Sequence, residues 1–280
     1  MSLIKLPEIK ASHAISKAKF DMRPDALEKW EPEIKAASEG DASISIYDSI
    51  GENWEGTGVT AKRISAALRA IGERGVVVNV NSPGGDFFEG VAIYNLFRQH
   101  KAKVTVRVMG LAASAASVIA MAGDEILMGD GSFLMIHNAW AVAIGNRHDM
   151  MEASEQLAPF DAAMADVYAA RSGMTSAEAA ALMDKETWIG AGQAVKDGLA
   201  TGLIEAEEIT HDAQAHGQKK YLALVEASMA KAGHSRSTRR DVFKNLFSGM
   251  PSAAGNDATP SAGTDIAASL QNLINTIKGA

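Results

Sequence analysis

The sequence predicts an α/β fold in which a parallel β-sheet is joined by crossover helices, with helical or disordered extensions at both ends. Two patterns predict it. Strand-like and helix-like segments alternate from residue 42 to residue 123, which is the order of strand–helix–strand units in a parallel sheet. In addition, residues 76–80 (VVVNV) form a short apolar run, which is typical of a strand covered on both faces.

The individual elements follow from local periodicity. Strands are predicted where apolar residues alternate with polar ones or run together, and helices where they recur at helical spacing. The predicted strands are 42–47, 76–80 and 103–108, and the predicted helices are 60–72, 86–100, the small-residue run 115–123, and 149–171. We expect Pro159 to kink the last helix, because proline removes a backbone donor and its ring crowds the preceding turn. The apolar stripe of this helix could serve the core or an interface between subunits.

Length and composition set the domain organisation. The chain has 280 residues, of which 47% are hydrophobic, enough for one core domain with appendages. We expect an N-terminal extension over 1–40, the core domain over 41–205, a helical and basic extension over 206–250, and a flexible linker with a terminal amphipathic helix over 251–280.

Composition also excludes several function classes. The chain has no cysteine, which excludes disulfides, a thiol nucleophile and cysteine-ligated zinc. Its net charge of −7 argues against general nucleic-acid binding. We expect no signal peptide, no membrane span, no metal and no cofactor, and the sequence lacks the glycine-rich phosphate loop that ATP hydrolysis would require.

A serine and a histidine are the first candidate catalytic residues. Ser114 follows the predicted strand 103–108 and precedes the predicted helix 115–123, and His137 ends the apolar run 134–137. A serine hydroxyl becomes a nucleophile when a base such as histidine takes its proton. Amides at a helix N-terminus also favour the oxyanion that forms beside such a serine. The simpler alternative is that Ser114 only caps its helix.

A glycine turn is the second candidate feature. Residues 81–86 (NSPGGD) directly follow the strand 76–80 and precede the helix 86–100. Glycine can take positive φ and lets the backbone approach a ligand without a Cβ in the way. This turn can therefore aim free amides at a reacting group, although an ordinary strand-to-helix connection would have the same composition.

Taken together, these motifs resemble those of the Clp protease proteolytic subunit. The matching segments, in the same order and at similar separations, are 81–85 (NSPGG), 90–94 (GVAIY), 110–114 (GLAAS) and 135–137 (MIH). The sequences of residues 111–117 (LAASAAS) and 183–188 (MDKETW), together with the N-terminal extension, are more similar to the phage branch, the Clp-like head maturation proteases. The resemblance extends over about residues 43–204 and implies a Clp/crotonase-like fold.

The resemblance assigns roles to individual residues. It makes Ser114 the nucleophile and His137 the general base, with oxyanion amides from Gly84, Gly85 and Ala115. Ser117 is then a neighbour whose hydroxyl bonds back to its own helix.

The third catalytic residue departs from the family pattern. The family has aspartate two residues before an aromatic residue, where this chain has Glu186 before Trp188. Glutamate orients the histidine in some hydrolase triads. Asp184 is the competitor, but it would require the loop to shift by two residues.

The resulting expectation is a serine endopeptidase that assembles into rings and cleaves capsid and scaffold proteins inside a prohead in the host cytoplasm. The alternatives are a bacterial cytosolic Clp-like peptidase, a crotonase-like acyl-CoA enzyme, and an inactive assembly protein. The basic cluster 234–240 is expected to be a solvated segment. Residues 264–278 place apolar residues on one helical face, which makes them a candidate contact with capsid or scaffold.

Overall fold

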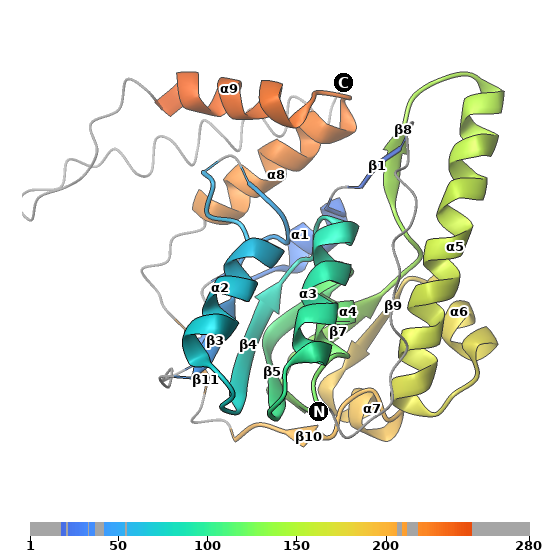
Figure 1. The fold of residues 1–280 in the computed structure, drawn as a ribbon. Coiled ribbons are helices and arrows are strands. Elements are labelled where there is room, and N and C mark those ends of the chain that lie inside the picture. The colour runs from blue at the N-terminus through green and yellow to red at the C-terminus, as the bar shows by residue number, and fades with distance from the viewer. Residues whose placement is uncertain are drawn as a thin grey trace, which may run out of the picture.

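One seven-stranded sheet forms the centre of the molecule (Figure 1). This computed structural model describes residues 18–20, 22–32, 34–36, 42–53, 55–205, 209–211 and 218–247. The strands of the sheet are β3 (Ser43–Ile46), β4 (Val76–Ser82), β5 (Val104–Ala113), β6 (Glu125–Met128), β7 (Phe133–Ile136), β9 (Thr187–Gly190) and β10 (Gly202–Leu203). Two short antiparallel pairs lie outside it, β1 (Ala18–Phe20) with β8 (Ala141–Ala143) and β2 (Ile34–Ala36) with β11 (Ile209–His211).

The predicted parallel sheet is confirmed. Neighbouring strands in the order β10-β6-β5-β4-β3 all run parallel. The long strand β5 pairs with β6 along its first half and with β7 along its second half, also in parallel. Only β9 reverses direction within this sheet, where it pairs with β7. The carboxyl ends of β5 and β7 therefore meet at one edge of the sheet.

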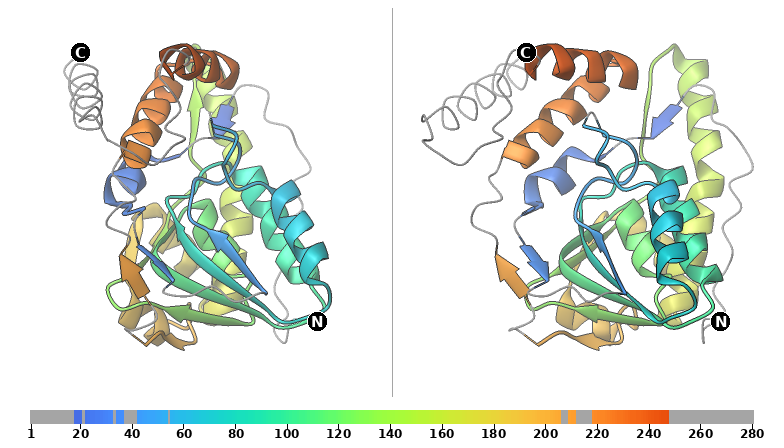
Figure 2. Two further views of the ribbon diagram at one scale, coloured as in Figure 1. Left: turned by 90° about the vertical axis from the view of Figure 1, so that its left-hand side faces the viewer. Right: turned by 60° about the vertical axis from the view of Figure 1, so that its left-hand side comes forward.

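Helices cover both faces of the sheet. The helices are α1 (Pro24–Lys29), α2 (Ala61–Ile71), α3 (Phe87–Gln99), α4 (Ala115–Ala120), α5 (Arg147–Ser172), α6 (Ser176–Asp184), α7 (Ala191–Lys196), α8 (Gln218–Lys231) and α9 (Arg236–Phe247). Helices α2, α3 and α5 lie on one side, whereas α1 and α8 lie on the other (Figure 2). The main core lies between the sheet and the first group, and a smaller apolar cluster lies under α1.

Local sequence signals explain the helix boundaries. The Thr60 side chain accepts the Arg63 N–H and so caps α2, which ends at Gly72 with φ 76°. Asp86 caps α3 in the same way through the Glu89 N–H. The six residues of α4 are all buried, as expected for a small-residue apolar run.

Helix α5 is slightly longer than predicted and contains Pro159 within one continuous helix. Its apolar stripe divides between two roles. Phe160 and Met164 are buried in the main core, whereas Met150 and Met151 near the helix start are 39% and 57% exposed. The core interpretation therefore holds from Leu157 onward, and the first turns of the helix leave apolar side chains exposed.

The extensions pack on the core domain. In the N-terminal one, Trp30 is fully buried and its Nε1 donates to Asn81 O at 3.0 Å. The basic cluster 234–240 is largely exposed, as expected of a solvated segment, except that Arg239 is only 4% exposed. Arg236 also pairs with Asp86 at 2.6 Å, and residues 236–240 open α9. Carboxylates from distant parts of the chain attract this cluster, which local composition did not reveal. The linker and helix expected over 251–280 lie outside the described residues.

Candidate active site

Ser114 is the single residue between the end of β5 and the start of α4. Its backbone has φ 54° and ψ −125°, a conformation that residues with a Cβ rarely adopt. In the described part of the chain, Glu186 is the only other non-glycine residue with positive φ. The Ser114 side chain caps no amide of α4, so the structure gives no support to a simple capping role. A strained strand-to-helix turn is the geometry in which α/β-hydrolases present a nucleophilic serine.

Backbone hydrogen bonds hold this turn in place. The Ser114 N–H donates to Met135 O at 2.9 Å, next to the parallel pair of Ala113 with Met135. The Ser114 carbonyl accepts the N–H groups of Ser117 and Val118 at 2.9 and 3.2 Å. This strand-to-helix turn at Ser114, called the elbow below, is thus fixed to β7 on one side and to α4 on the other.

Ser117 bonds back to its own helix as predicted. Its Oγ donates to the Ser114 carbonyl oxygen at 2.6 Å, and the residue is fully buried. A buried hydroxyl engaged in this way is a poor candidate for the nucleophile.

The glycine turn lies directly against the elbow. A Cβ built on Gly84 would lie 2.7 Å from the Ser114 Cβ, so only glycine permits this approach. The Gly84 N–H donates to Ser82 Oγ at 3.2 Å. Among the residues that the structure describes, the N–H groups of Gly85 and Ala115 have no acceptor. These two amides are therefore the free donors beside Ser114.

His137 lies at the same edge of the sheet, one residue beyond β7. Because β5 and β7 are parallel and in register at Ala113 and Met135, the strand ends place Ser114 and His137 side by side in the fold. His137 is 5% exposed, and within the described residues neither ring nitrogen has a hydrogen-bond partner. No Ser114–His137 hydrogen bond is present in this arrangement.

Burial sets the protonation state of His137. It lowers the pKa of this imidazole from 6.5 to about 4, and the Arg23 guanidinium adds to the effect by repelling a positive charge. The carboxylates of Asp25 and Glu186 act in the opposite direction. His137 is accordingly neutral at neutral pH, which is the form that accepts a proton.

Glu186 is placed opposite His137 by the antiparallel pair of β7 and β9. Ile136 pairs with Thr187, so the next positions, His137 and Glu186, face each other across the end of the pair. The Glu186 carboxylate is instead held by Arg23, whose Nη1 and Nη2 donate to its two oxygens, the second at 2.7 Å. This hydrogen-bonded pair lowers the pKa of Glu186.

Asp184 is also close to the candidate base in the structure, through the residue that follows His137. It is the last residue of α6, and its Oδ1 accepts Asn138 Nδ2 at 2.8 Å. The structure therefore brings both candidate acids to the neighbourhood of His137 and joins neither to it.

Arg23 and Asp25 are the residues that sequence reasoning missed. Arg23 Nε donates to Asp25 at 2.8 Å, so the two arrive together at the site from the N-terminal extension. A separation of 163 positions between Arg23 and Glu186 leaves no local pattern that could have signalled the contact.

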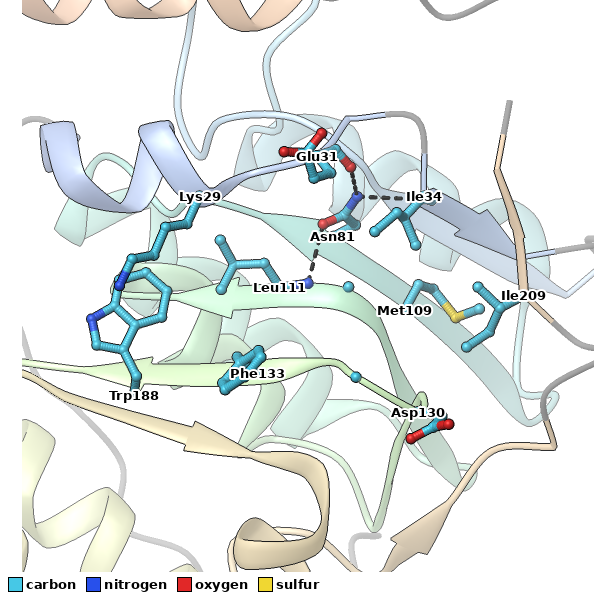
Figure 3. A pocket seen from close by; sticks show the side chains of 12 residues that line it. Lys29, Glu31, Ile34, Asn81, Met109, Leu111, Asp130, Phe133, Trp188 and Ile209 are labelled. Carbon is cyan, nitrogen blue, oxygen red and sulfur yellow. Dashed lines mark hydrogen bonds between the residues drawn. The ribbon is translucent and has the colours of Figure 1, made fainter. Parts of the chain in front are cut away.

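A cavity of about 460 Å³ lies between the sheet and the N-terminal extension (Figure 3). Asn81 closes one wall, because its amide donates to Glu31 O and Ile34 O and its Oδ1 accepts the Leu111 N–H. At the other end Lys29 Nζ lies 3.8 Å from the centre of the Trp188 ring. Ser114 and His137 do not line this cavity, so it is separate from the candidate catalytic groups.

Comparison with known proteins identifies the family. A profile described as Clp protease matches residues 41–207. The chain belongs to the Clp protease family. Membership of this family implies a serine peptidase, which is a hydrolase, and it favours that reading over an acyl-CoA enzyme.

Individual Clp proteins are distant relatives. The ATP-dependent Clp protease proteolytic subunit of Deinococcus radiodurans is 25% identical over 184 residues, which span 61% of this chain and 90% of that protein. The corresponding subunit of Ligilactobacillus salivarius is 28% identical over 184 residues, spanning 61% of this chain and 93% of that protein.

Among solved structures, a ClpP1 mutant from Listeria monocytogenes has a TM-score of 0.49 and 21% identity, covering 59% of this chain and 91% of that one.

Proposed function

We propose that this Clp-family chain is a serine endopeptidase in which Ser114 attacks the peptide carbonyl and His137 takes up the hydroxyl proton. The observation that carries the proposal is the strained elbow at Ser114, whose side chain has no capping role. The parallel pair of β5 and β7 supports it by placing His137 at the same sheet edge. His137 is also in the neutral form that a general base requires.

Backbone amides complete the chemistry. Attack by the Ser114 oxygen converts the peptide carbonyl into an oxyanion, which the N–H groups of Gly85 and Ala115 stabilise, while Gly84 permits the close approach of the turn. His137 then gives its proton to the leaving amine as the peptide bond breaks. Water hydrolyses the resulting ester on Ser114 with the same histidine as base, which restores the enzyme.

Glu186 is the proposed orienting acid. It lies opposite His137 across the β7–β9 pair, and a carboxylate in that position fixes the imidazole orientation and stabilises the imidazolium. To act, it must exchange its contact with Arg23 for one with His137. Asp184 is the competitor, and its present contact is with Asn138.

Peptidase assays on single variants test these assignments. Ser114→Ala should abolish peptide cleavage while the protein stays folded, since it removes one hydroxyl that makes no capping contact. Glu186→Gln should lower turnover roughly a thousand-fold or more, because the amide cannot stabilise the imidazolium, whereas Asp184→Asn should be milder. Wild-type cleavage by Ser114→Ala would refute the mechanism, and the reverse ranking of the two acid variants would transfer the role to Asp184.

We also propose that the substrates are capsid and scaffold proteins in a phage prohead and that the active form is a ring. The support is the similarity of segments 111–117 and 183–188 to Clp-like head maturation proteases. In this proposal the protease works in the host cytoplasm, within the assembling prohead. The candidate capsid or scaffold contact at 264–278 lies outside the described residues.

Co-expression with phage capsid and scaffold proteins tests this specificity. The wild-type chain should convert them to shorter products, and the Ser114→Ala variant should not. A different function, that of a general cytosolic peptidase with an ATPase partner, is favoured by the relatives named ATP-dependent Clp protease proteolytic subunit. Degradation of an unfolded protein only when a Clp ATPase and ATP are added would support that second function and contradict the prohead role.

A further inference from the structure

Two buried hydroxyl groups lie in series beneath the elbow. Ser117 in α4 is fully buried, and Tyr168 in α5 is 1% exposed. The Ser117 Oγ donates to the Ser114 carbonyl oxygen at 2.6 Å, and it lies 2.8 Å from the Tyr168 hydroxyl oxygen. A continuous path of hydrogen bonds therefore links the backbone of the candidate nucleophile to helix α5.

The donor direction along this path is fixed by proton count. A serine hydroxyl has one hydrogen, and Ser117 gives it to the Ser114 carbonyl. The remaining contact requires the Tyr168 hydroxyl to donate to the Ser117 oxygen. Burial raises the pKa of Tyr168, so its phenol keeps the proton that it must donate. Hydrogen bonds in such a chain polarise and strengthen one another.

The carbonyl at the end of this hydrogen-bonded path belongs to Ser114, a residue with an unfavourable backbone conformation. Ser114 has φ 54°, and its carbonyl already accepts the Ser117 and Val118 N–H groups. The side-chain bond from Ser117 is an additional restraint on the same oxygen. It connects the elbow to α5, which packs on the main core through Phe160 and Met164.

We propose that Tyr168 is a positioning residue for the Ser114 nucleophile, acting through the Ser117 hydroxyl. This inference rests on the proposed serine peptidase function. Loss of the Ser117 hydroxyl removes one restraint on the Ser114 carbonyl, and loss of the Tyr168 hydroxyl weakens the same restraint by removing the donor that orients and polarises Ser117. The elbow then relaxes, and the Ser114 oxygen loses alignment with the reacting carbonyl. Substrate binding is unaffected, because neither hydroxyl is exposed to a substrate.

The test compares Tyr168→Phe, Ser117→Ala and the double variant with the wild-type chain. We expect kcat and the rate of Ser114 labelling by a fluorophosphonate to fall about 10- to 100-fold in each single variant, since small misplacements of reacting groups have effects of this size. KM should change by less than about two-fold. The double variant should be no slower than the worse single variant, because the two hydroxyls form one chain.

Tyr94→Phe is the matched control. It removes the hydroxyl of another fully buried tyrosine, in α3, and should leave kcat and labelling unchanged. Urea unfolding of every variant separates lost stability from lost alignment, and Ser117→Ala provides the same test if Tyr168→Phe does not fold. Wild-type kcat in folded Tyr168→Phe or Ser117→Ala would overturn the inference, as would an equal loss in Tyr94→Phe. If the wild-type chain itself is not labelled at Ser114, the proposed function fails first, and the positioning role fails with it.

Discussion

Arg23 occupies the carboxylate that the proposed mechanism assigns to His137. Arg23 holds both oxygens of Glu186, while His137, opposite the same residue, has neither ring nitrogen bonded among the described residues. The Arg23 charge also disfavours the imidazolium that forms during attack. In this arrangement Arg23 keeps the proposed orienting acid away from the proposed base.

Arg23→Gln should therefore raise the rate at which a fluorophosphonate labels Ser114, by at least about three-fold, because the carboxylate becomes free to pair with the imidazolium. Lys29→Gln is the control, since it removes a positive charge from the last residue of α1, the helix that Arg23 precedes, at a position that contacts Trp188 instead. A slower reaction of Arg23→Gln, with Lys29→Gln unchanged, would mean that Arg23 supports the site.

The lowered pKa of His137 makes stability depend on pH. An unfolded histidine binds a proton near pH 6.5, whereas the folded one does so only near pH 4. Stability from this difference is complete above pH 6.5 and is lost as the pH falls toward 4, amounting to a loss of about 2 kcal/mol at pH 5. Urea unfolding at pH 7 and pH 5 measures it. Between pH 7 and pH 5 the free energy of unfolding of His137→Gln should fall by about 2 kcal/mol less than that of the wild-type chain. An equal fall in both proteins would contradict a buried, neutral His137.

At the scale of elements, the contact between the glycine turn and the elbow is the feature on which the site most depends. Gly84 has φ 89°, and a Cβ there would lie 2.6 Å from Ala113 O and 2.7 Å from the Ser114 Cβ. The end of β5, the glycine turn and the start of α4 thus pack so closely that no side chain fits at position 84.

Gly84→Ala should abolish labelling of Ser114 and cost at least about 2 kcal/mol more stability than Gly72→Ala. Gly72 is the matched control because it has φ 76° with no atom within 4 Å of an added Cβ, so it reports the backbone strain alone. Similar unfolding free energies for the two variants would show that the glycine turn is not in close steric contact with the elbow.

Helices, strands and turns differ from long-range contacts in how well the sequence predicts them. Helices α2 and α3 were predicted from local apolar periodicity, within one or two residues of the ends where Thr60, Gly72 and Asp86 cap them, and the valine run predicted β4. The Ser114 turn followed from a strand pattern meeting a helix pattern. The contacts that α9 and Arg23 make were not predicted, because they are ion pairs between segments far apart in sequence. The hydroxyl chain from Tyr168 was missed for the same reason, since it joins positions 51 residues apart.

For the whole molecule, the exposed apolar start of α5 is the candidate contact between subunits of the proposed ring. Ile144, Met150 and Met151 are 73%, 39% and 57% exposed, and exposed apolar groups of this kind favour association. Helices of the described residues lack the length and apolar character needed to cross a bilayer.

Met151→Lys should convert the assembled protein to smaller species in sedimentation velocity, because a buried unpaired ammonium is costly. Ala70→Lys adds the same charge at an exposed position of a different helix, α2, and should leave the assembly intact. Assembly of Met151→Lys at wild-type size would remove this surface from the interface.

The identity of the nucleophile is the central claim. Incubation of the purified full chain with a fluorophosphonate, followed by mass spectrometry of its peptides, tests it most directly, since only an activated hydroxyl beside oxyanion donors reacts. The label should be on Ser114, because its side chain makes no capping contact and lies beside the free Gly85 and Ala115 amides. A label on Ser117, or none on the folded protein, would contradict the account.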